Sequence, residues 1–191
     1  QDFDYACGIT QRVAEAVSIP VMIKVTPQVT DLVAFSGELK KAGASAVTLT
    51  NRFIGFVPDI ETGKPFIYGQ AGIGGPWIKP LTLRWINEVR QAFKNELYIA
   101  GTNGAYDWRD IVQFIMSGAH IVEMCAAVMA YGYEWMGKQV KGLEKYMDEY
   151  GYATIPDMLG IASDAAIQYS EMPYEKARVN TELCTNCGRC L

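Results

Sequence analysis

The sequence predicts an α/β protein whose strands pair in parallel. Short apolar runs rich in β-branched residues are each followed by a stretch with the 3.6-residue period of an amphipathic helix, and this unit occurs four times. The predicted strands are residues 19–25, 44–51, 97–101 and 119–125. A helix between two strands usually returns the chain to start the next parallel strand, so we expect one parallel sheet.

Each predicted helix has a start or stop signal that fits its place. Thr30 or Asp31 can cap the first helix, which Gly43 closes, and Asp107 can cap the third, which ends at Gly118. The second and fourth helices are predicted over residues 81–93 and 132–151. A Gly- and Pro-rich stretch, residues 55–80, separates the second strand from its helix and is too long to be an idle connection.

The number of units favours part of a larger barrel. A (β/α)8 barrel usually takes about 250 residues, whereas here about 150 residues supply half of its units. The alternatives are an open sheet or the C-terminal part of a (β/α)8 TIM barrel, and we adopt the second. The expected divisions are residues 1–150 for the barrel portion, 151–179 for a connector and 180–191 for a separate cysteine-bearing segment.

Composition excludes several classes of protein. The 17 basic and 21 acidic residues give a net charge of −4 and leave no basic stripe, so no nucleic acid partner is expected. No apolar run approaches the ~20 residues of a membrane span. The five cysteines are not spread like a disulfide framework, since three lie in the last eight residues. We therefore expect a cytoplasmic protein without a membrane span.

The last cysteines form a C-x2-C-x2-C pattern. Cys184, Cys187 and Cys190 have the spacing that opens a bacterial ferredoxin run, in which successive thiolates bind the irons of one [4Fe-4S] cluster. A zinc site would need a fourth Cys or a His nearby, and free surface thiols are the other alternative. The single histidine, His120, lies on a predicted strand and is expected to be a hydrogen-bonded core residue. The pattern predicts metal ligands at the start of a ferredoxin-like iron-sulfur segment.

Two strand ends carry features suited to an anionic cofactor. Residues 101–107, GTNGAYD, lie between a strand and a helix, where the backbone amides of Asn103 and Gly104 can face a phosphate. Lys24 ends an otherwise apolar strand, where its charge must find a partner or face a ligand. Parallel α/β folds bind their ligands at the carboxyl ends of the strands, which is where Lys24 lies. An ammonium at this position could stabilise the negative charge that a flavin gains on reduction.

Several segments together resemble the flavin domain of dihydropyrimidine dehydrogenase and the wider dihydroorotate dehydrogenase family. They include IPVMIKVTPQVTD, GASAVTLTN, AGIGGPWIKP, YIAGTNGAYD, SGAHIVEMCAAVM and ELCTNCGRC, in the same order along nearly the whole chain. The resemblance implies an FMN and iron-sulfur dependent oxidoreductase that acts on a C=C or CH-CH bond. It also implies a small-molecule substrate, a redox partner such as a flavoprotein that oxidises NAD(P)H, and an oligomer.

The resemblance assigns roles to residues position by position. Lys24 would meet the flavin ring, and Asn51 would lie beside the substrate. The remaining FMN-binding residues would be Gly72, Gly75, Thr102, Asn103, Gly104, Cys125 and Ala126. The active-site cysteine that serves as acid or base is expected outside this chain, and Cys7 is expected to be a small buried residue.

Three departures from the family pattern bear on the substrate and the phosphate turn. Gln28 replaces a frequent Asn, and Asn103 replaces the first of two frequent glycines. Arg52 follows Asn51, where the pyrimidine enzymes have a small hydroxyl residue. A guanidinium suits a carboxylate or phosphate, so we expect a substrate more acidic than uracil, unless Arg52 pairs with Asp59 or Glu61. A dihydroorotate-type dehydrogenase and a non-catalytic electron-transfer subunit remain alternatives.

Overall fold

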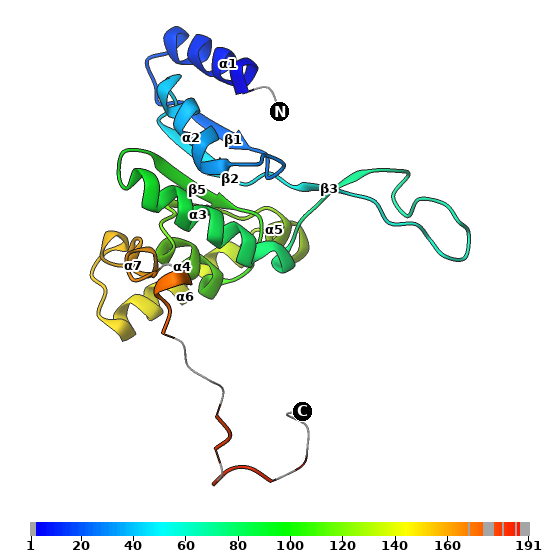
Figure 1. Ribbon diagram of the computed structural model, residues 1–191, viewed down its shortest axis with the longest axis vertical. Helices are drawn as coiled ribbons and strands as arrows, with labels where there is room; N and C mark the ends of the chain where they lie inside the picture. Colours follow the sequence, from blue (N-terminus) through cyan, green and yellow to red (C-terminus); the bar gives the residue numbers. More distant parts are fainter. Residues whose placement is uncertain (1–2, 168, 174–177, 181, 186, 188–191) are drawn as a thin grey trace.

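The computed structural model confirms the predicted α/β class and describes residues 3–167, 169–173, 178–180, 182–185 and 187. Four parallel strands form one sheet in the order β1-β2-β5-β6 (Figure 1). These strands are β1 Met22–Val25, β2 Ala46–Leu49, β5 Tyr98–Thr102 and β6 Ile121–Glu123. This order is that of the sequence, as expected for part of a TIM barrel.

Helices connect the parallel strands, and the two with predicted caps, α2 Leu32–Lys41 and α4 Trp108–Met116, begin where the sequence signals predicted. Asp31 accepts a hydrogen bond from the Ala34 amide at the start of α2, and Asp107 and Asp110 form a capping box at the start of α4. The α-helices are α1 Phe3–Ala16, α2 Leu32–Lys41, α3 Lys79–Phe93, α4 Trp108–Met116, α5 Ala126–Tyr131, α6 Glu134–Tyr150 and α7 Ile161–Asp164. Short 3-10 turns are η1 Pro76–Ile78, η2 Ile155–Met158 and η3 Tyr169–Glu171.

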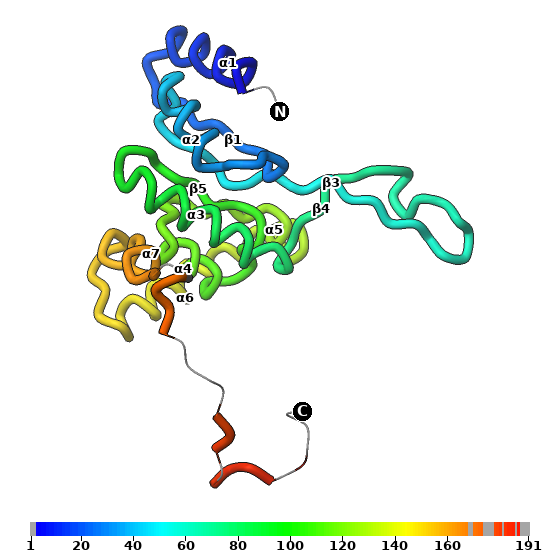
Figure 2. The backbone as a smooth tube through the Cα atoms, in the orientation of Figure 1, coloured from blue at the N-terminus to red at the C-terminus, as the bar shows by residue number. Residues whose placement is uncertain are grey.

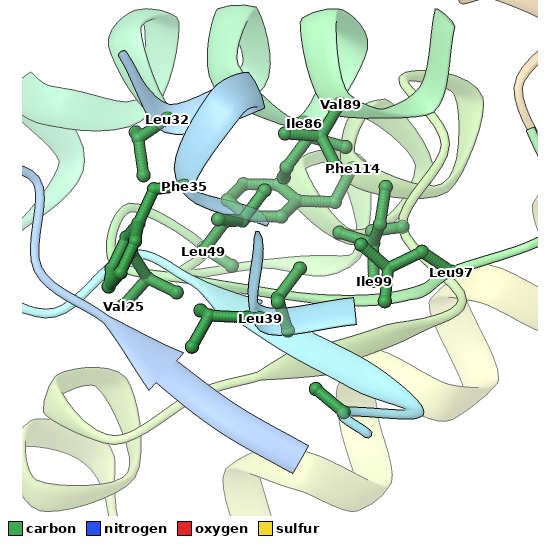
Figure 3. Close-up of a cluster of buried hydrophobic side chains, with 14 residues drawn as sticks. Val25, Leu32, Phe35, Leu39, Leu49, Ile86, Val89, Leu97, Ile99 and Phe114 are labelled. Atoms are coloured by element: carbon green, nitrogen blue, oxygen red, sulfur yellow. The ribbon is translucent and has the colours of Figure 1, made fainter. Parts of the chain in front are cut away.

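One face of the sheet packs against the helices and forms the core. Leu39 of α2, Val89 of α3 and Phe114 of α4 are fully buried against strand residues such as Leu49 and Ile99 (Figure 3). Because side chains alternate along a strand, every second strand residue enters this core. Burying each of these large side chains contributes about 1.5–3 kcal/mol, so the layer of helices fixes the sheet on which the strand ends are displayed.

The other face of the sheet is partly open. Met22, Tyr98 and Ile121 are exposed there among the described residues, while Lys24, Thr48 and Glu123 lie on it toward the carboxyl ends of the strands. In a TIM barrel, helices cover the outer face of the sheet and side chains of the strands fill the interior. A sheet with helices on only one face is consistent with part of such a barrel.

The Gly- and Pro-rich stretch contains a two-stranded antiparallel ribbon that the sequence did not predict. Its strands are β3 Phe53–Gly55 and β4 Ala71–Ile73. Each strand has only three residues, too few for an alternating pattern to be recognised. The ribbon and its connecting turn project from the body (Figures 1 and 2).

The structure adds helices α1 and α5 to the predicted strand–helix units. Helix α1 covers residues for which we made no prediction, and its Phe3 ring stacks on Phe35 of α2. Helix α5 follows β6 directly, where a loop was expected. Its six residues are too few to show a helical period, so the sequence offered little evidence of it.

The first half of the predicted connector packs on the α/β body. Met158 is fully buried, the Gly160 amide donates to the Ile115 carbonyl over 2.9 Å, and the Gln91 side chain donates to the Ser163 carbonyl over 3.2 Å. The described residues of the cysteine segment lie away from the body in Figure 1. Across the part of the chain that is described, no helix has both the length and the apolar character needed to cross a membrane.

Candidate functional site

A cavity of about 530 Å³ lies at the carboxyl ends of the parallel strands. Its walls come from the ends of β1, β2, β5 and β6, from the start of α5, and from the two chain segments that lead into and out of the projecting ribbon. A cavity of this size matches the usual range of small-molecule and cofactor sites. Its position is the one at which parallel α/β folds bind their ligands.

Lys24 reaches this cavity from the end of β1 and forms an ion pair inside it. Its Nζ donates to Oε2 of Glu123 over 3.2 Å, and Oε1 of Glu123 accepts from the Thr48 hydroxyl over 3.2 Å. The Lys24 and Glu123 side chains remain 49% and 37% exposed, so solvent screens the pair. The pair therefore orients the ammonium but leaves it accessible to a ligand in the cavity.

The turn after β5 forms another wall. Asn103 has a positive φ of 72°, a conformation that asparagine tolerates better than most residues. Its side chain accepts from the Gly75 amide over 3.3 Å and donates to the Asn51 carbonyl over 3.4 Å. Asn103 thus joins the ends of two strands to the segment that follows the ribbon, and its carbonyl accepts from the Thr82 hydroxyl over 2.9 Å.

A charged pair beneath this turn holds its shape. Lys79 Nζ donates to Oδ1 of Asp110 over 2.5 Å, and Oδ2 of Asp110 accepts from the amides of Tyr106 and Asp107 over 2.7 and 3.1 Å. Burial raises the pKa of Asp110, but these hydrogen bonds outweigh it and hold the pKa below its ordinary value of 3.8. The carboxylate therefore stays charged and fixes the turn at neutral pH.

The remaining wall is a glycine wall, in which the backbone lies close to neighbouring residues. A Cβ on Gly74 would lie 2.4 Å from Oδ1 of Asn103, and one on Gly72 would lie 3.0 Å from Nε of Arg52. Gly104 has a φ of 126°, and a Cβ there would lie 2.8 Å from the Cα of Lys79. A side chain at any of these positions would disturb the walls of the cavity, which explains why glycine occupies them.

The guanidinium of Arg52 lies along this glycine wall. Within the residues that the structure describes, Arg52 forms no ion pair, so the alternative pairing with Asp59 or Glu61 does not occur. Asp59 instead accepts hydrogen bonds from Thr62 and from the Glu61 amide within its own turn. Arg52 is left with an unpartnered charge at the cavity.

The start of α5 closes the cavity with backbone and a thiol. Cys125 is the N-cap residue of α5 and makes no side-chain capping bond, and Ala126 is the first helical residue. In the described chain the amides of Gly104, Cys125 and Ala126 donate to no protein acceptor. These groups are hydrogen-bond donors that a ligand anion can satisfy.

The structure brings together all the residues that the sequence assigned to substrate and cofactor. The predicted residues on the cavity wall are Lys24, Asn51, Arg52, Gly72, Gly75, Thr102, Asn103, Gly104, Cys125 and Ala126. Their individual roles stay predictions. Sequence reasoning missed Glu123, although it places a charge near the end of a predicted apolar strand, which is the signal that identified Lys24.

Other residues with reactive side chains lie elsewhere. Cys7 is on α1 and does not line the cavity, and burial raises the pKa of its thiol. His120 accepts from the Ile99 amide over 3.1 Å through Nδ1, and burial together with the charge of Arg90 lowers the pKa of its imidazole. His120 is thus the hydrogen-bonded structural residue that the sequence predicted.

The cysteine segment contributes no described metal centre. Cys184 and Cys187 are exposed, and Cys190 lies outside the described residues. Among the residues that are described, no three His, Cys, Asp or Glu side chains gather as a metal site. The cluster ligands therefore stay a prediction.

Comparison with known families shows what most of the chain is similar to. The sequence pattern of the family described as dihydroorotate dehydrogenase matches residues 1–147. The chain belongs to the dihydroorotate dehydrogenase family. This membership agrees with the position of the cavity at the strand ends and with a four-stranded parallel sheet that is consistent with part of a barrel.

Relatives in the dihydroorotate dehydrogenase family include catalytic subunits. The catalytic subunit of dihydroorotate dehydrogenase B (NAD(+)) from Methanothermobacter thermautotrophicus is 34% identical over 166 residues, which are 86% of this chain and 54% of that protein. The subunit of the same name from Pyrococcus furiosus is 29% identical over 163 residues, 85% of this chain and 54% of that protein. The PreA subunit of the NAD-dependent dihydropyrimidine dehydrogenase of Escherichia coli is 26% identical over 184 residues, 91% of this chain and 44% of that protein. The chain thus spans about half the length of these relatives.

Proposed function

We propose that this chain is the FMN-binding part of an oxidoreductase that acts on a CH-CH bond. The observation that carries the proposal is the single cavity that holds every residue assigned to flavin and substrate. Family membership supports a dehydrogenase. When bound, FMN would supply hydride transfer to or from a carbon atom of the substrate.

The walls of the cavity fit this cofactor. Glycines at positions 72, 74 and 75 line the cavity with backbone, and their missing side chains leave room for the side chains of Arg52, Asn103 and Trp77 to pack behind that wall. The unpartnered amides of Gly104, Cys125 and Ala126 suit the terminal phosphate. Glycine-lined walls beside backbone amides without protein acceptors are compatible with a flavin mononucleotide.

Lys24 and Glu123 would adjust the reduction potential of the bound flavin. The Lys24 ammonium favours negative charge on the ring, and Glu123 both holds the ammonium in place and opposes part of its charge. The pair would thus set how readily the bound flavin is reduced. Thr48 donates to Glu123 and keeps the carboxylate turned toward Lys24.

Asn51 and Arg52 would bind the substrate, and their chemistry favours an organic acid. Oδ1 of Asn51 accepts from the Arg52 amide over 2.9 Å, which leaves the side-chain NH2 as the donor to a ligand. The Arg52 guanidinium has no ion-pair partner in the described chain and suits a carboxylate. Dihydroorotate, which names the relatives in M. thermautotrophicus and P. furiosus, is a carboxylic acid. We therefore favour a dihydroorotate-like acid over a neutral pyrimidine.

Binding of orotate and uracil to the purified flavoprotein tests this choice. We expect orotate to perturb the flavin absorbance with higher affinity than uracil, and Arg52→Ala to weaken orotate binding about 10-fold or more while uracil binding changes little. Arg52→Lys should recover part of the loss, since it keeps the charge without the planar fork. Equal loss for both ligands would point to a structural role for Arg52, and no loss would remove it from the site.

The terminal cysteines would add electron transfer to this chemistry. Cys184, Cys187 and Cys190 would ligate a [4Fe-4S] cluster, with the fourth ligand outside this run. A separate subunit would supply the electrons by oxidising NAD(P)H, or receive them by reducing NAD(P)+, which agrees with the subunit names of the relatives. Analysis of iron and acid-labile sulfide in the wild-type protein and in the Cys187→Ser variant tests the cluster separately from the flavin.

A further inference from the structure

Another cavity, of about 650 Å³, lies between helices α4 and α6 and shares no lining residue with the cavity at the strand ends. The two helices pack side by side (Figure 1), and the Trp108 amide donates to Oε1 of Gln139 over 3.0 Å. A Cβ on Gly142 would lie 2.3 Å from Cδ1 of Trp108, so glycine at this position lets the Trp108 ring lie against α6. We call this cavity the α4–α6 groove. Its volume lies in the usual range of small-molecule sites.

Three aromatic rings give the α4–α6 groove an apolar surface. The ring centroids of Trp108 and Tyr146 lie 5.8 Å apart, and the Tyr150 ring stacks on that of Tyr146 with centroids 4.5 Å apart. Tyr150 is 62% exposed, so much of its side chain is uncovered by the described chain. Because these rings hold one another in place, they offer a preformed surface on which a flat ligand can stack.

The polar lining of the α4–α6 groove carries an excess of positive charge, although the whole chain has a net charge of −4. Arg109 and Lys145 line it, and Glu149 is the acidic residue among its lining residues. The Arg109 guanidinium lies 4.3 Å from the centroid of the Trp108 ring. Its pair with Asp107 is 3.6 Å long and 68% exposed on the arginine side, so solvent weakens it. Lys145 forms no ion pair within the described residues, so both cations are available to an anion.

This combination of rings and cations narrows the kind of ligand. A neutral apolar molecule would leave the two cations without a partner, and a small inorganic anion would leave the aromatic surface uncovered. A flat aromatic ring that carries a phosphate group uses both features, since aromatic side chains stack on bases and Arg and Lys bind phosphate. A long nucleic acid strand would need a continuous basic track, which the sequence lacks.

We propose that the α4–α6 groove is a binding site for a mononucleotide, with the base stacked on Tyr150 and the phosphate held by Arg109 and Lys145. The site is separate from the cavity at the strand ends, so it does not depend on the proposed oxidoreductase function. Glu149 is the acceptor within the lining that can bind the amino or hydroxyl groups of such a ligand.

Isothermal titration calorimetry with AMP as the probe tests the proposal. We expect saturable binding of one AMP per chain, with adenosine and inorganic phosphate each bound at least about 10-fold more weakly. The double variant Arg109→Ala/Lys145→Ala should weaken AMP binding at least about 10-fold. The matched control Arg84→Ala/Lys141→Ala removes the same charge from exposed residues that do not line the groove, and it should leave the affinity for AMP unchanged.

A second variant separates the role of the ring from that of the charge. Tyr150→Ala should weaken AMP binding about 10-fold and leave the binding of inorganic phosphate unchanged. Arg109, Lys145 and Tyr150 are exposed, so all the variants should retain the wild-type circular dichroism spectrum.

Three results would overturn the proposal: no saturable AMP binding at millimolar concentration, equal affinities for AMP and inorganic phosphate, or equal losses in the double variant and its matched control. Release of bound flavin by AMP, followed by absorbance, would place AMP in the cavity at the strand ends and would also overturn it.

Discussion

Asp110→Asn is expected to destabilise the protein and weaken the proposed phosphate turn. The Asp110 side chain is 12% exposed and that of Lys79 is 26% exposed, so their 2.5 Å bond is sheltered from solvent. Asparagine can still accept from the Tyr106 and Asp107 amides with its oxygen, but its NH2 group then faces the Lys79 ammonium. The variant therefore loses a charged hydrogen bond and leaves a cation without its partner.

The expected cost is about 2 kcal/mol, the usual contribution of a hydrogen bond to a charged group. For a domain of this size, that loss corresponds to a fall of about 4–8 °C in Tm. The matched control is Asp164→Asn, because Asp164 and Lys94 form an exposed pair at 3.7 Å with side chains 58% and 64% exposed. That substitution should cost less than about 0.5 kcal/mol.

Urea unfolding of both variants from pH 3 to pH 8 provides the assay. Because the folded-state pKa of Asp110 lies below its ordinary value of 3.8, its contribution is fully present above that value and is lost as the pH falls through the folded pKa. The gap between wild type and Asp110→Asn should therefore be largest at neutral pH and shrink in acid. A gap below about 0.5 kcal/mol at pH 7, or equal losses in the Asp164→Asn control, would refute the reasoning.

The remaining predictions concern the cavity and the core. In urea unfolding, Gly104→Ala should lower the free energy of unfolding by about 2 kcal/mol or more beyond the loss caused by Gly63→Ala. Both glycines have a positive φ, but only a Cβ at Gly104 would meet neighbouring backbone, at 2.8 Å from the Cα of Lys79. Similar losses for the two variants would exclude the steric explanation. Glu123→Gln should raise the reduction potential of bound FMN, measured against redox dyes, because it leaves the Lys24 charge unopposed, and an unchanged or lower potential would contradict that role. The folded-state pKa of His120 lies below its ordinary value of 6.5, so protonation disfavours the fold and the wild-type free energy of unfolding should fall as the pH drops below about 6.5. The variant His120→Asn keeps a hydrogen-bond acceptor and should flatten that dependence on pH. Parallel slopes for the two proteins would rule out His120 as the cause.

The sequence allowed the sheet and much of the cavity to be predicted because both follow from local patterns. The strand ending at Lys24 and the turn at Asn103 and Gly104 each stand in a single short segment, and parallel strands bring their carboxyl ends together. The caps at Asp31 and Asp107 depend on neighbours within three residues, so they too were visible.

The parts that sequence reasoning missed depend on contacts between distant residues or on very short elements. The partner of Lys24 is Glu123, 99 positions away, and no local pattern pairs them. The projecting ribbon contains two strands of three residues, whose pairing depends on their antiparallel register rather than on either sequence alone. Arg52 was predicted to face either a ligand or a nearby acid, and only the structure shows that Asp59 is engaged in its own turn.

Comparative binding of FMN and riboflavin to the purified protein tests the central claim most directly. The account predicts one FMN per chain, with riboflavin bound roughly 10- to 100-fold more weakly because it lacks the phosphate that the amides of Gly104, Cys125 and Ala126 would bind. Fluorescence quenching of the two flavins gives both constants under the same conditions. A protein that binds neither flavin, or that binds both with equal affinity, would contradict the assignment of the cavity as a flavin mononucleotide site.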